Sequence, residues 1–390
     1  MHPELFTLPI LGVPIRMYGF WLMVGFLSGV WLAMRRAQRV KADPDRVLDM
    51  SFLALIFGVV GARAFYVVHY WKSDFASAPN RLLAAIDITG GGLEFLGGFL
   101  GATAAILIYA VRKKVSARMY CDILAPSVMW GLAFTRIGCF FNGCCFGGVC
   151  VVPSTQQPAL AWAVRFPFGS PVHLRQWEDR RVTVPAELIT SAPGALRPWL
   201  LPASMLSMSV EKREEPNRRY QELLKEYEEA KAESPDAKAT AVLKSAVEAA
   251  RKKKNDQDRK LVSLRVAQRF PSRLVPTRST SVTELEDLAA RQRSLPVHPT
   301  QLYSAIHGIL LSGLLSALFY IRKRHGVVIG ALFVLYPIPR AILEFIRADN
   351  PHDVAGLTAS QFVSLIMLIV GVVYLIFLYK RLPERSPVLE

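Results

Sequence analysis

The sequence predicts an all-α polytopic membrane protein: seven transmembrane helices, an extracytoplasmic head and a charged helical insert. Three observations lead to this prediction. Hydrophobic residues make up 52% of the 390 residues, slightly above the usual share in soluble domains. Many of them gather in apolar runs of about 20 residues, the length of a helix that crosses a bilayer. Short basic segments separate several of these runs, and the chain carries a formal net charge of +16.

Each apolar run is interpreted as one membrane-spanning helix. Two runs, those ending at 141 and 346, are less uniform because arginines lie near their ends. The third run contains the glycine-rich stretch GGGLEFLGGFLGA, in which glycine allows close approach of either a neighbouring helix or a ligand. The predicted spans are 17–34, 51–70, 93–112, 122–141, 301–321, 326–346 and 358–379.

Four basic clusters indicate how the chain is oriented. They lie at 35–41, 111–114, 321–326 and 379–385, at the ends of spans one, three, five and seven. Short loops rich in Lys and Arg stay in the cytoplasm. The N-terminus is therefore predicted to be extracytoplasmic and the C-terminus cytoplasmic. No basic segment precedes the first apolar run, so we expect no cleavable secretory signal.

Four regions follow from this pattern. Residues 1–141 form the first part of the membrane body, with spans one to four and an N-terminal outer arm, and 291–390 form the second, with spans five to seven. Residues 142–205 are the extracytoplasmic head, and 206–290 are the charged helical insert. The insert is expected to form a helical hairpin, which acts either as a docking arm or as a solvated insertion without a partner. Apolar residues recur at helical spacing in both of its halves: Tyr220, Leu223, Leu224 and Tyr227, then Leu243, Ala246, Val247 and Ala250.

Charged residues in or beside the spans are candidates for function, because a charge in hydrocarbon is costly. Arg136 is near the outer end of span four, and Arg340, Glu344 and Arg347 occupy successive turns of span six. Arginine is suited to bidentate recognition of phosphate. We therefore expect a cationic cavity in the outer half of the membrane. A structural Arg–Glu network is the alternative, and for Arg63 in span two both interpretations remain open.

Four of the five cysteines fall within twelve residues, at Cys139, Cys144, Cys145 and Cys150. A zinc site prefers well-spaced pairs of ligands, and two adjacent cysteines suit it poorly. The sequence therefore predicts no metal. A disulfide outside the membrane is plausible from this spacing. A membrane thiol oxidoreductase is a further alternative, but it leaves the arginines unexplained.

Six motifs follow one another through the membrane body: RMYGFWLMVGF (16–26), GARAFYVV (61–68), GGLEFLGG (91–98), RIGCFFNGCCFG (136–147), HPTQLYSA (298–305) and RAILEFIRAD (340–349). In residues and in order, they resemble the motifs of the prolipoprotein diacylglyceryl transferases. The resemblance covers nearly all of the membrane body and leaves out the charged block at about 206–290. The family's topology, seven spans with the N-terminus outside, matches the one predicted from charge.

The resemblance implies an enzyme of the bacterial cytoplasmic (inner) membrane. It would transfer the diacylglyceryl group of phosphatidylglycerol to the lipobox cysteine thiol of prolipoproteins, the first step of lipoprotein maturation. A thioether forms and glycerol phosphate is released. The implied partners are phosphatidylglycerol, the prolipoprotein signal peptide and membrane lipid, with no cofactor and no nucleic acid. The resemblance implies that Arg136 and Arg340 are catalytic. It also implies that phosphatidylglycerol is bound by Arg136 and by seven further residues: Tyr18, Arg63, Asn142, Gly147, His298, Gln301 and Glu344.

One position departs from the family pattern. Leu96 stands where the family often has His or Tyr, so the resemblance assigns no general base. The alternative function is a divergent paralogue that binds phospholipid or lipoprotein precursors without this activity.

The charge pattern gives a direct test of orientation. A reporter inserted within 210–260 should be extracytoplasmic, and a reporter fused to the C-terminus should be cytoplasmic, since the four basic clusters share one side of the membrane. Paired alkaline phosphatase and fluorescent-protein fusions measure both positions. Finding both reporters on the same side would contradict the seven-span topology.

Overall fold

The computed structural model describes residues 4–7, 14–71, 75, 81–86, 92–152, 155, 157–190, 199–200, 210–233, 242–251, 282–347 and 356–381. The chain divides into two compact units, which are described separately. The membrane unit comprises His2–Gly148 and Pro299–Glu390, and the head unit comprises Val149–His298.

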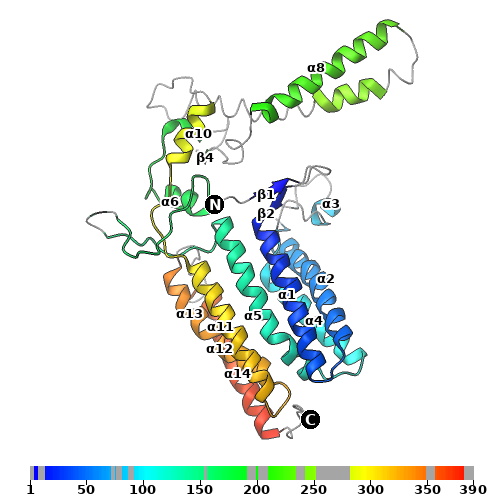
Figure 1. Cartoon of the computed structure of the whole chain (residues 1–390), viewed down its shortest axis with the longest axis vertical. Helices are drawn as coiled ribbons and strands as arrows, with labels where there is room; N and C mark the ends of the chain where they lie inside the picture. Colours follow the sequence, from blue (N-terminus) through cyan, green and yellow to red (C-terminus); the bar gives the residue numbers. More distant parts are fainter. Residues whose placement is uncertain are drawn as a thin grey trace. The chain divides into compact units, whose positions relative to one another are not determined.

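Seven helical segments of the membrane unit are long and apolar enough to cross a bilayer, which confirms the predicted fold class and a multi-pass membrane protein. Several extend a few residues beyond the predicted limits, because a helix continues through the polar residues that flank its apolar centre. Figure 1 shows the spans: α1 (Met17–Arg39), α2 (Pro44–His69), α4 (Phe95–Arg112), α5 (Ala117–Asn142), α11 (Thr300–Ile321), α12 (Val327–Leu335) with α13 (Pro337–Ile346), and α14 (Ala359–Arg381).

The spans begin and break where the sequence dictates. Asp43 caps α2 by accepting a hydrogen bond from the Asp45 backbone N–H, and Pro44 occupies the first helical position, which needs no donor. Thr358 and Gln361 form a reciprocal pair of hydrogen bonds at the start of α14. Span six is divided at Tyr336, because Pro337 and the proline two residues later lack the N–H groups that continuous helical bonding requires.

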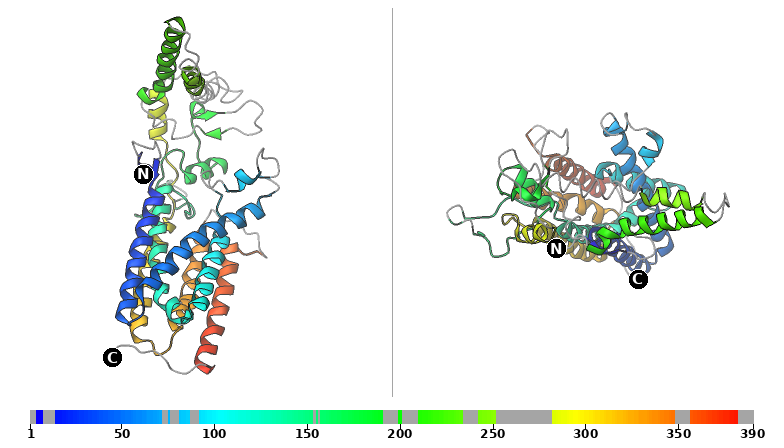
Figure 2. Two further views of the ribbon diagram at one scale, coloured as in Figure 1. Left: turned by 90° about the vertical axis from the view of Figure 1, so that its right-hand side faces the viewer. Right: turned by 90° about the horizontal axis from the view of Figure 1, so that it is seen from above.

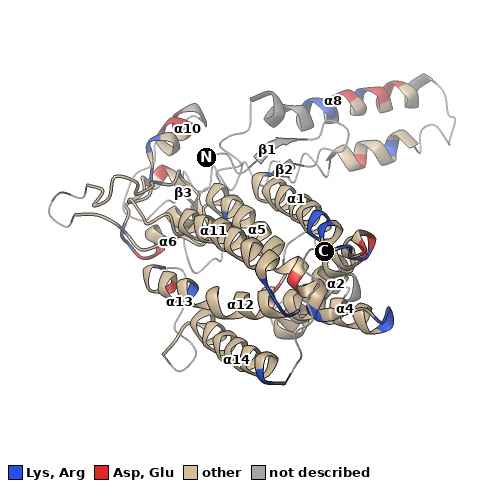
Figure 3. Ribbon diagram, turned by 60° about the horizontal axis from the view of Figure 1, so that its bottom comes forward, with Lys and Arg blue, Asp and Glu red and all other residues tan. Residues whose placement is uncertain are grey.

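Basic residues mark one end of the membrane unit. They lie in the last turns of α1, α4 and α14 and directly after α11, and the ribbon in Figure 3 is blue at these helix ends. The alternation of the seven spans therefore brings the four basic clusters to the same end, as the charge pattern requires.

Large apolar side chains remain exposed along the spans, as a lipid-facing surface demands. Val68, Phe95 and Phe345 are 78%, 84% and 80% exposed. Figure 2 shows the long helices of the membrane unit from the side and along their length. Hydrocarbon can cover this surface, whereas water could not do so without a large free-energy cost.

Helices α2 and α4 pack with their backbones in contact. A Cβ atom on Gly97 would collide with the Gly61 carbonyl oxygen, and a Cβ on Gly101 would collide with the Phe57 carbonyl oxygen. Small residues allow such approach, and dispersion between the two backbones stabilises the pair within lipid. For these glycines, the structure favours close helix packing over contact with a ligand.

A buried arginine joins α1 to two other helices. Arg36, near the end of α1, donates hydrogen bonds to Ser127 Oγ on α5 (2.8 Å) and to Ser316 Oγ on α11 (3.0 Å). It also donates to the Ile123 carbonyl oxygen (3.4 Å). Hydroxyl and carbonyl oxygens thus replace the water that a guanidinium loses on burial.

A buried aspartate fixes the start of α12. The Asp122 side chain, on α5, accepts hydrogen bonds from the backbone N–H groups of Gly326 (2.7 Å), Val328 (3.0 Å) and Ile329 (3.0 Å). Arg322 Nε lies 3.0 Å from the same carboxylate. A helix start has free N–H groups and a partial positive charge. Asp122 satisfies these groups from another helix, and Arg322 balances its charge.

The head unit is held by contacts between its two ends. Val164 and Val297 pair as antiparallel backbone neighbours, and the Gln176 side chain accepts a hydrogen bond from the Leu295 N–H (2.7 Å). The helices and strands described in this unit are α6 (Pro171–Glu178), η2 (Ala186–Leu188), β3 (Ile189–Thr190), β4 (Trp199–Leu200), α8 (Val210–Glu233), a helical segment at 242–251 and α10 (Val282–Arg291).

Both halves of the expected hairpin contain helix, at α8 and 242–251, and Leu223 and Val247 are buried. The segment between these two helices, 234–241, lies outside the described residues. The end of the charged insert belongs to the head itself, because Leu285 on α10 packs with Phe168 and Leu188 in one apolar core. Two short strands, β1 (Glu4–Thr7) and β2 (Pro14–Arg16), pair near the N-terminus, and α3 (Arg81–Ile86) follows α2.

Replacing Gly101 with alanine should destabilise the membrane unit by about 1–3 kcal/mol, because the added methyl group forces α2 and α4 apart. Unfolding of purified protein by SDS in mixed micelles measures the change. Gly313→Ala on α11 is the matched control, since a Cβ there meets no atom within 4 Å. Equal stability of the two variants would contradict backbone contact between α2 and α4.

Replacing Asp122 with alanine should cost about 3–5 kcal/mol, as expected when one partner of a buried ion pair is removed. Asp122→Asn should lose less, because its amide oxygen can still accept from the start of α12. Asp43→Ala, which removes an exposed cap from α2, serves as the control with a smaller loss. SDS unfolding ranks the three variants, and a loss for Asp43→Ala as large as that for Asp122→Ala would contradict the role of Asp122.

Candidate active site

The candidate active site lies at the end of α5, around Arg136. This arginine is half-buried, and its Nε atom is completely buried and has no hydrogen-bond partner among the residues that the structure describes. Its guanidinium interacts electrostatically with Cys139, Cys145, Tyr336 and Arg347. A buried donor without a partner is unfavourable by about 1–3 kcal/mol, and by more when the group is charged. The position therefore suits an anion that would accept from this guanidinium.

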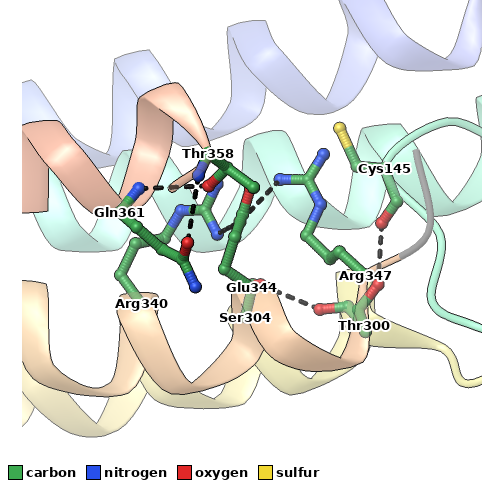
Figure 4. Close-up of polar contacts among 8 residues, drawn as sticks. All are labelled: Cys145, Thr300, Ser304, Arg340, Glu344, Arg347, Thr358 and Gln361. Atoms are coloured by element: carbon green, nitrogen blue, oxygen red, sulfur yellow. Dashed lines mark hydrogen bonds and ion pairs between the residues drawn. The ribbon is translucent and has the colours of Figure 1, made fainter. Parts of the chain in front are cut away.

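Helix α13 contributes two further arginines and one carboxylate. Glu344 is buried between Arg340 and Arg347, as Figure 4 shows. Arg340 Nη1 donates to Glu344 Oε2, and Arg347 Nη1 lies 3.7 Å from the same oxygen. One carboxylate between two guanidiniums leaves a positive charge in excess. Arg136 and Arg347 are close enough to interact electrostatically, and Arg340 is bonded to Glu344. Their convergence on one cavity in the outer half of the membrane stays a prediction.

The segment from Gly143 to Gly148, here named the site loop, follows α5 directly. Gly143 ends the helix in the left-handed conformation, with φ of 73°, as glycine allows. Cys145 is also left-handed, with φ of 59°, which is uncommon for a residue with a side chain. These two residues turn the chain back over the end of α5.

Two neighbouring helices hold the site loop. On α11, Gln301 Nε2 donates to the Cys144 carbonyl oxygen and Thr300 Oγ1 donates to the Cys145 carbonyl oxygen, both at 2.8 Å. At the end of α13, the Gly148 N–H donates to the Ile346 carbonyl oxygen at 2.7 Å. The loop conformation is thus fixed from both sides.

The turn brings three thiols together. The Sγ atoms of Cys139, Cys144 and Cys145, here named the cysteine cluster, all lie within 4.8 Å of one another. Hydrogen bonds from the Cys139 and Cys144 thiols hold the pKa of Cys145 below its ordinary value, and the Arg136 and Arg347 guanidiniums add to this effect. The objection that adjacent cysteines cannot gather around a metal therefore does not apply to this backbone.

Three further predicted residues border the same place. The backbone and ring of Tyr18 on α1 lie against Gly138, where an added Cβ would be 3.2 Å from them. The Asn142 side chain hydrogen-bonds the Cys144 sulfur. Gly147 is buried and pairs with Arg347 in an antiparallel bridge.

Arg63 has a different environment from Arg136. Its guanidinium donates to the carbonyl oxygens of Ala84 (2.7 Å), Ala85 (2.8 Å) and Gly92 (2.9 Å). These bonds join α3 and the segment before α4 to α2. They favour the structural alternative for Arg63, which the sequence left open.

His298 is the last residue of the head unit, so its relation to Arg136 stays a prediction. Two ionisable residues of the spans were missed by the sequence analysis. Asp122 caps α12, and His307 on α11 stacks on Tyr336 with ring centres 6.1 Å apart. Their positions within apolar runs could have identified them from the sequence, because ionisable residues rarely occur in membrane spans without a role.

The arrangement combines a cationic surface with several thiols at the end of a membrane helix. It can bind a phosphate group through Arg136 and stabilise negative charge that develops during a reaction. It can also lower the free energy of a thiolate.

Comparison with known proteins agrees with the motifs. The family model described as "Prolipoprotein diacylglyceryl transferase" matches residues 3–218 and 248–377. The gap within this match, 219–247, is narrower than the block at about 206–290 that was expected to lie outside the family.

Curated relatives are phosphatidylglycerol–prolipoprotein diacylglyceryl transferases. The protein of Rhodopirellula baltica is 39% identical over 167 residues, which are 42% of this chain and 32% of that protein. The Photobacterium profundum protein is 38% identical over 159 residues, 40% of this chain and 56% of its own length. The Vibrio cholerae protein is 36% identical over 174 residues, which are 44% of this chain and 59% of that protein. The chain thus spans about a third to three fifths of these relatives. Because the family model matches most of its residues, the chain belongs to the prolipoprotein diacylglyceryl transferase family.

Proposed function

We propose that this protein transfers the diacylglyceryl group of phosphatidylglycerol to the lipobox cysteine thiol of prolipoproteins. The reaction forms a thioether and releases glycerol phosphate. Family membership supports the reaction class, and the names of the relatives, phosphatidylglycerol–prolipoprotein diacylglyceryl transferases, support the two substrates. The observation that carries the proposal is the buried Nε of Arg136, which has no hydrogen-bond partner in the described part of the chain.

The charge of the site suits this substrate. Arg136, Arg340 and Arg347 together with Glu344 carry an excess of two positive charges, counted from their residue types. A phosphodiester has one negative charge, and the phosphate monoester that leaves approaches two at neutral pH. The site therefore becomes better matched as the reaction proceeds, which is the condition for lowering the barrier.

In the proposed step, the substrate thiolate attacks the glyceryl carbon that bears the phosphate. The new C–S bond forms as the C–O bond to phosphate breaks, and the bonding electrons remain on the phosphate oxygen. Arg136 stabilises this oxygen with charge-assisted hydrogen bonds in a region with little water. Arg340, which is held by Glu344, adds positive charge to the same region.

The remaining candidates are assigned to binding of phosphatidylglycerol. Tyr18 and Asn142 lie next to the cysteine cluster, and Gly147 allows the site loop to run close to α13. Gln301 acts indirectly, since its amide holds the site loop. His298 is retained as a binding residue on the strength of its motif.

The proposed location is the bacterial inner membrane, with the N-terminus extracytoplasmic and the C-terminus cytoplasmic. The lipobox would then reach the site from the outer half of the membrane. The basic ends of α1, α4, α11 and α14 support this orientation.

Arg136→Lys should insert and fold but lose about 10²–10³ in transfer rate, by analogy with the removal of an oxyanion-hole donor. Lysine supplies the charge but not the planar fork that meets two phosphate oxygens. The measurement is transfer from labelled phosphatidylglycerol to a lipobox peptide by purified protein in detergent.

Arg112→Lys is the matched control, because Arg112 is exposed in the last turn of α4. It should retain the full rate. A near wild-type rate for Arg136→Lys would overturn the role of this guanidinium. Failure of the wild-type chain to complement a strain depleted of its own transferase would instead overturn the proposed reaction and favour a binding paralogue.

A further inference from the structure

The cysteine cluster at the end of α5 is not explained by the phosphate chemistry. Its three thiols come from one short segment, and they come together because Cys145 adopts the left-handed backbone conformation. A non-glycine residue in this conformation is unfavourable and persists only when the surroundings fix it. The bonds from Thr300 and Gln301 supply that fixation.

We propose that the cysteine cluster binds one Zn²⁺ ion through three thiolates and leaves the fourth position open for the lipobox thiol of the substrate. This inference rests on the proposed function, which it deepens by naming how the nucleophile is activated.

The geometry fits this ion. A Zn–S bond of about 2.3 Å in a tetrahedral site places two sulfur ligands about 3.8 Å apart. The three Sγ atoms already lie within 4.8 Å of one another, so small side-chain rotations complete the site. Thiolates are soft ligands, and zinc is among the ions that they select.

The number of ligands favours a reactive site over a purely structural one. Structural zinc sites have four protein ligands, whereas catalytic sites have three and one exchangeable position. Among the residues that the structure describes, no His, Asp or Glu joins the three thiols. A fourth ligand would therefore be water or a substrate atom.

The surroundings balance the charge. Three thiolates and Zn²⁺ carry one net negative charge, and the Arg136 and Arg347 guanidiniums both act on Cys145. Arg136 is also three residues before Cys139 on the same face of α5. A thiol bound at the open position would thus lie beside the arginine proposed to hold the phosphate.

Coordination to zinc would activate the lipobox thiol for attack. The lipobox thiol binds zinc as a thiolate and its proton passes to water, because a coordinated thiol is deprotonated. Its sulfur then forms the C–S bond while the glyceryl C–O bond breaks, and the thioether leaves the metal. The phosphate keeps the electron pair, so no oxidant or reductant is consumed. Such a step needs no histidine or tyrosine at the place of Leu96.

Metal content tests the site independently of activity. The full-length protein, purified in detergent without chelator, should contain about one zinc per chain by plasma mass spectrometry. The triple variant C139S/C144S/C145S should lose it, and Cys121→Ser, outside the cluster, should retain it. Cobalt in place of zinc should give thiolate-to-cobalt absorption in the wild type and not in the triple variant. Copper in place of zinc, no metal, or a disulfide within the cluster would overturn the proposal.

The pH profile tests the role in catalysis. A free cysteine thiol has a pKa of about 8.5, so without zinc the transfer rate should fall about tenfold per pH unit below that value. With zinc, the rate should stay nearly constant down to about pH 7. Wild-type protein stripped by a chelator and then reloaded with zinc makes the same comparison without a mutation that could prevent folding.

Two outcomes separate the two proposals. Identical pH profiles for the loaded and the stripped enzyme would overturn thiol activation by zinc and leave the transferase standing. Bound zinc and cobalt absorption in a chain that has no transferase activity would overturn the proposed function and retain the metal site.

Discussion

Every charge within an apolar body needs a partner, and this constraint organises the membrane unit. Asp122 pairs with Arg322 and caps α12, Arg36 bonds to oxygens on two other helices, and Glu344 sits between two arginines. The first two arrangements join elements that are distant in the sequence, whereas the third lies within α13 and the residue that follows it. Charge burial is tolerated because hydrogen bonds replace hydration, and the same bonds fix how the helices pack.

Arg136 differs from these pairs, since its buried Nε atom has no partner in the described part of the chain. The site loop is tied to α11 through Cys144 and Cys145, and to α13 through Gly148. A catalytic group is most effective when it is held before the substrate arrives, because no reorganisation is then needed during the reaction. The structural ion pairs thus prepare a site in which one cation remains available for an anion.

The same loop links the proposed phosphate chemistry to the thiol chemistry. Cys139 follows Arg136 by nearly one helical turn, so the end of α5 presents both a guanidinium and sulfur atoms. A thioether-forming reaction needs an activated sulfur and a stabilised phosphate in reach of each other. A single helix end with a short reversed loop supplies both, and the rest of the membrane unit serves to hold that end in place.

The sequence by itself determined the seven spans, the common side of the basic clusters and the family, because each depends on local composition or on short motifs. It also identified Arg136, Arg340 and Glu344 as costly and therefore informative residues. Only the tertiary structure decided the rest. The bonds of Arg63 to Ala84, the clash that Gly101 avoids at Phe57, and the packing of Leu285 into the head core join residues whose proximity no local pattern encodes. The cysteine cluster shows the reason most directly. Its spacing looks unsuitable for a metal, but the left-handed residues Gly143 and Cys145, in a loop held by α11 at Cys144 and Cys145, bring three thiols together.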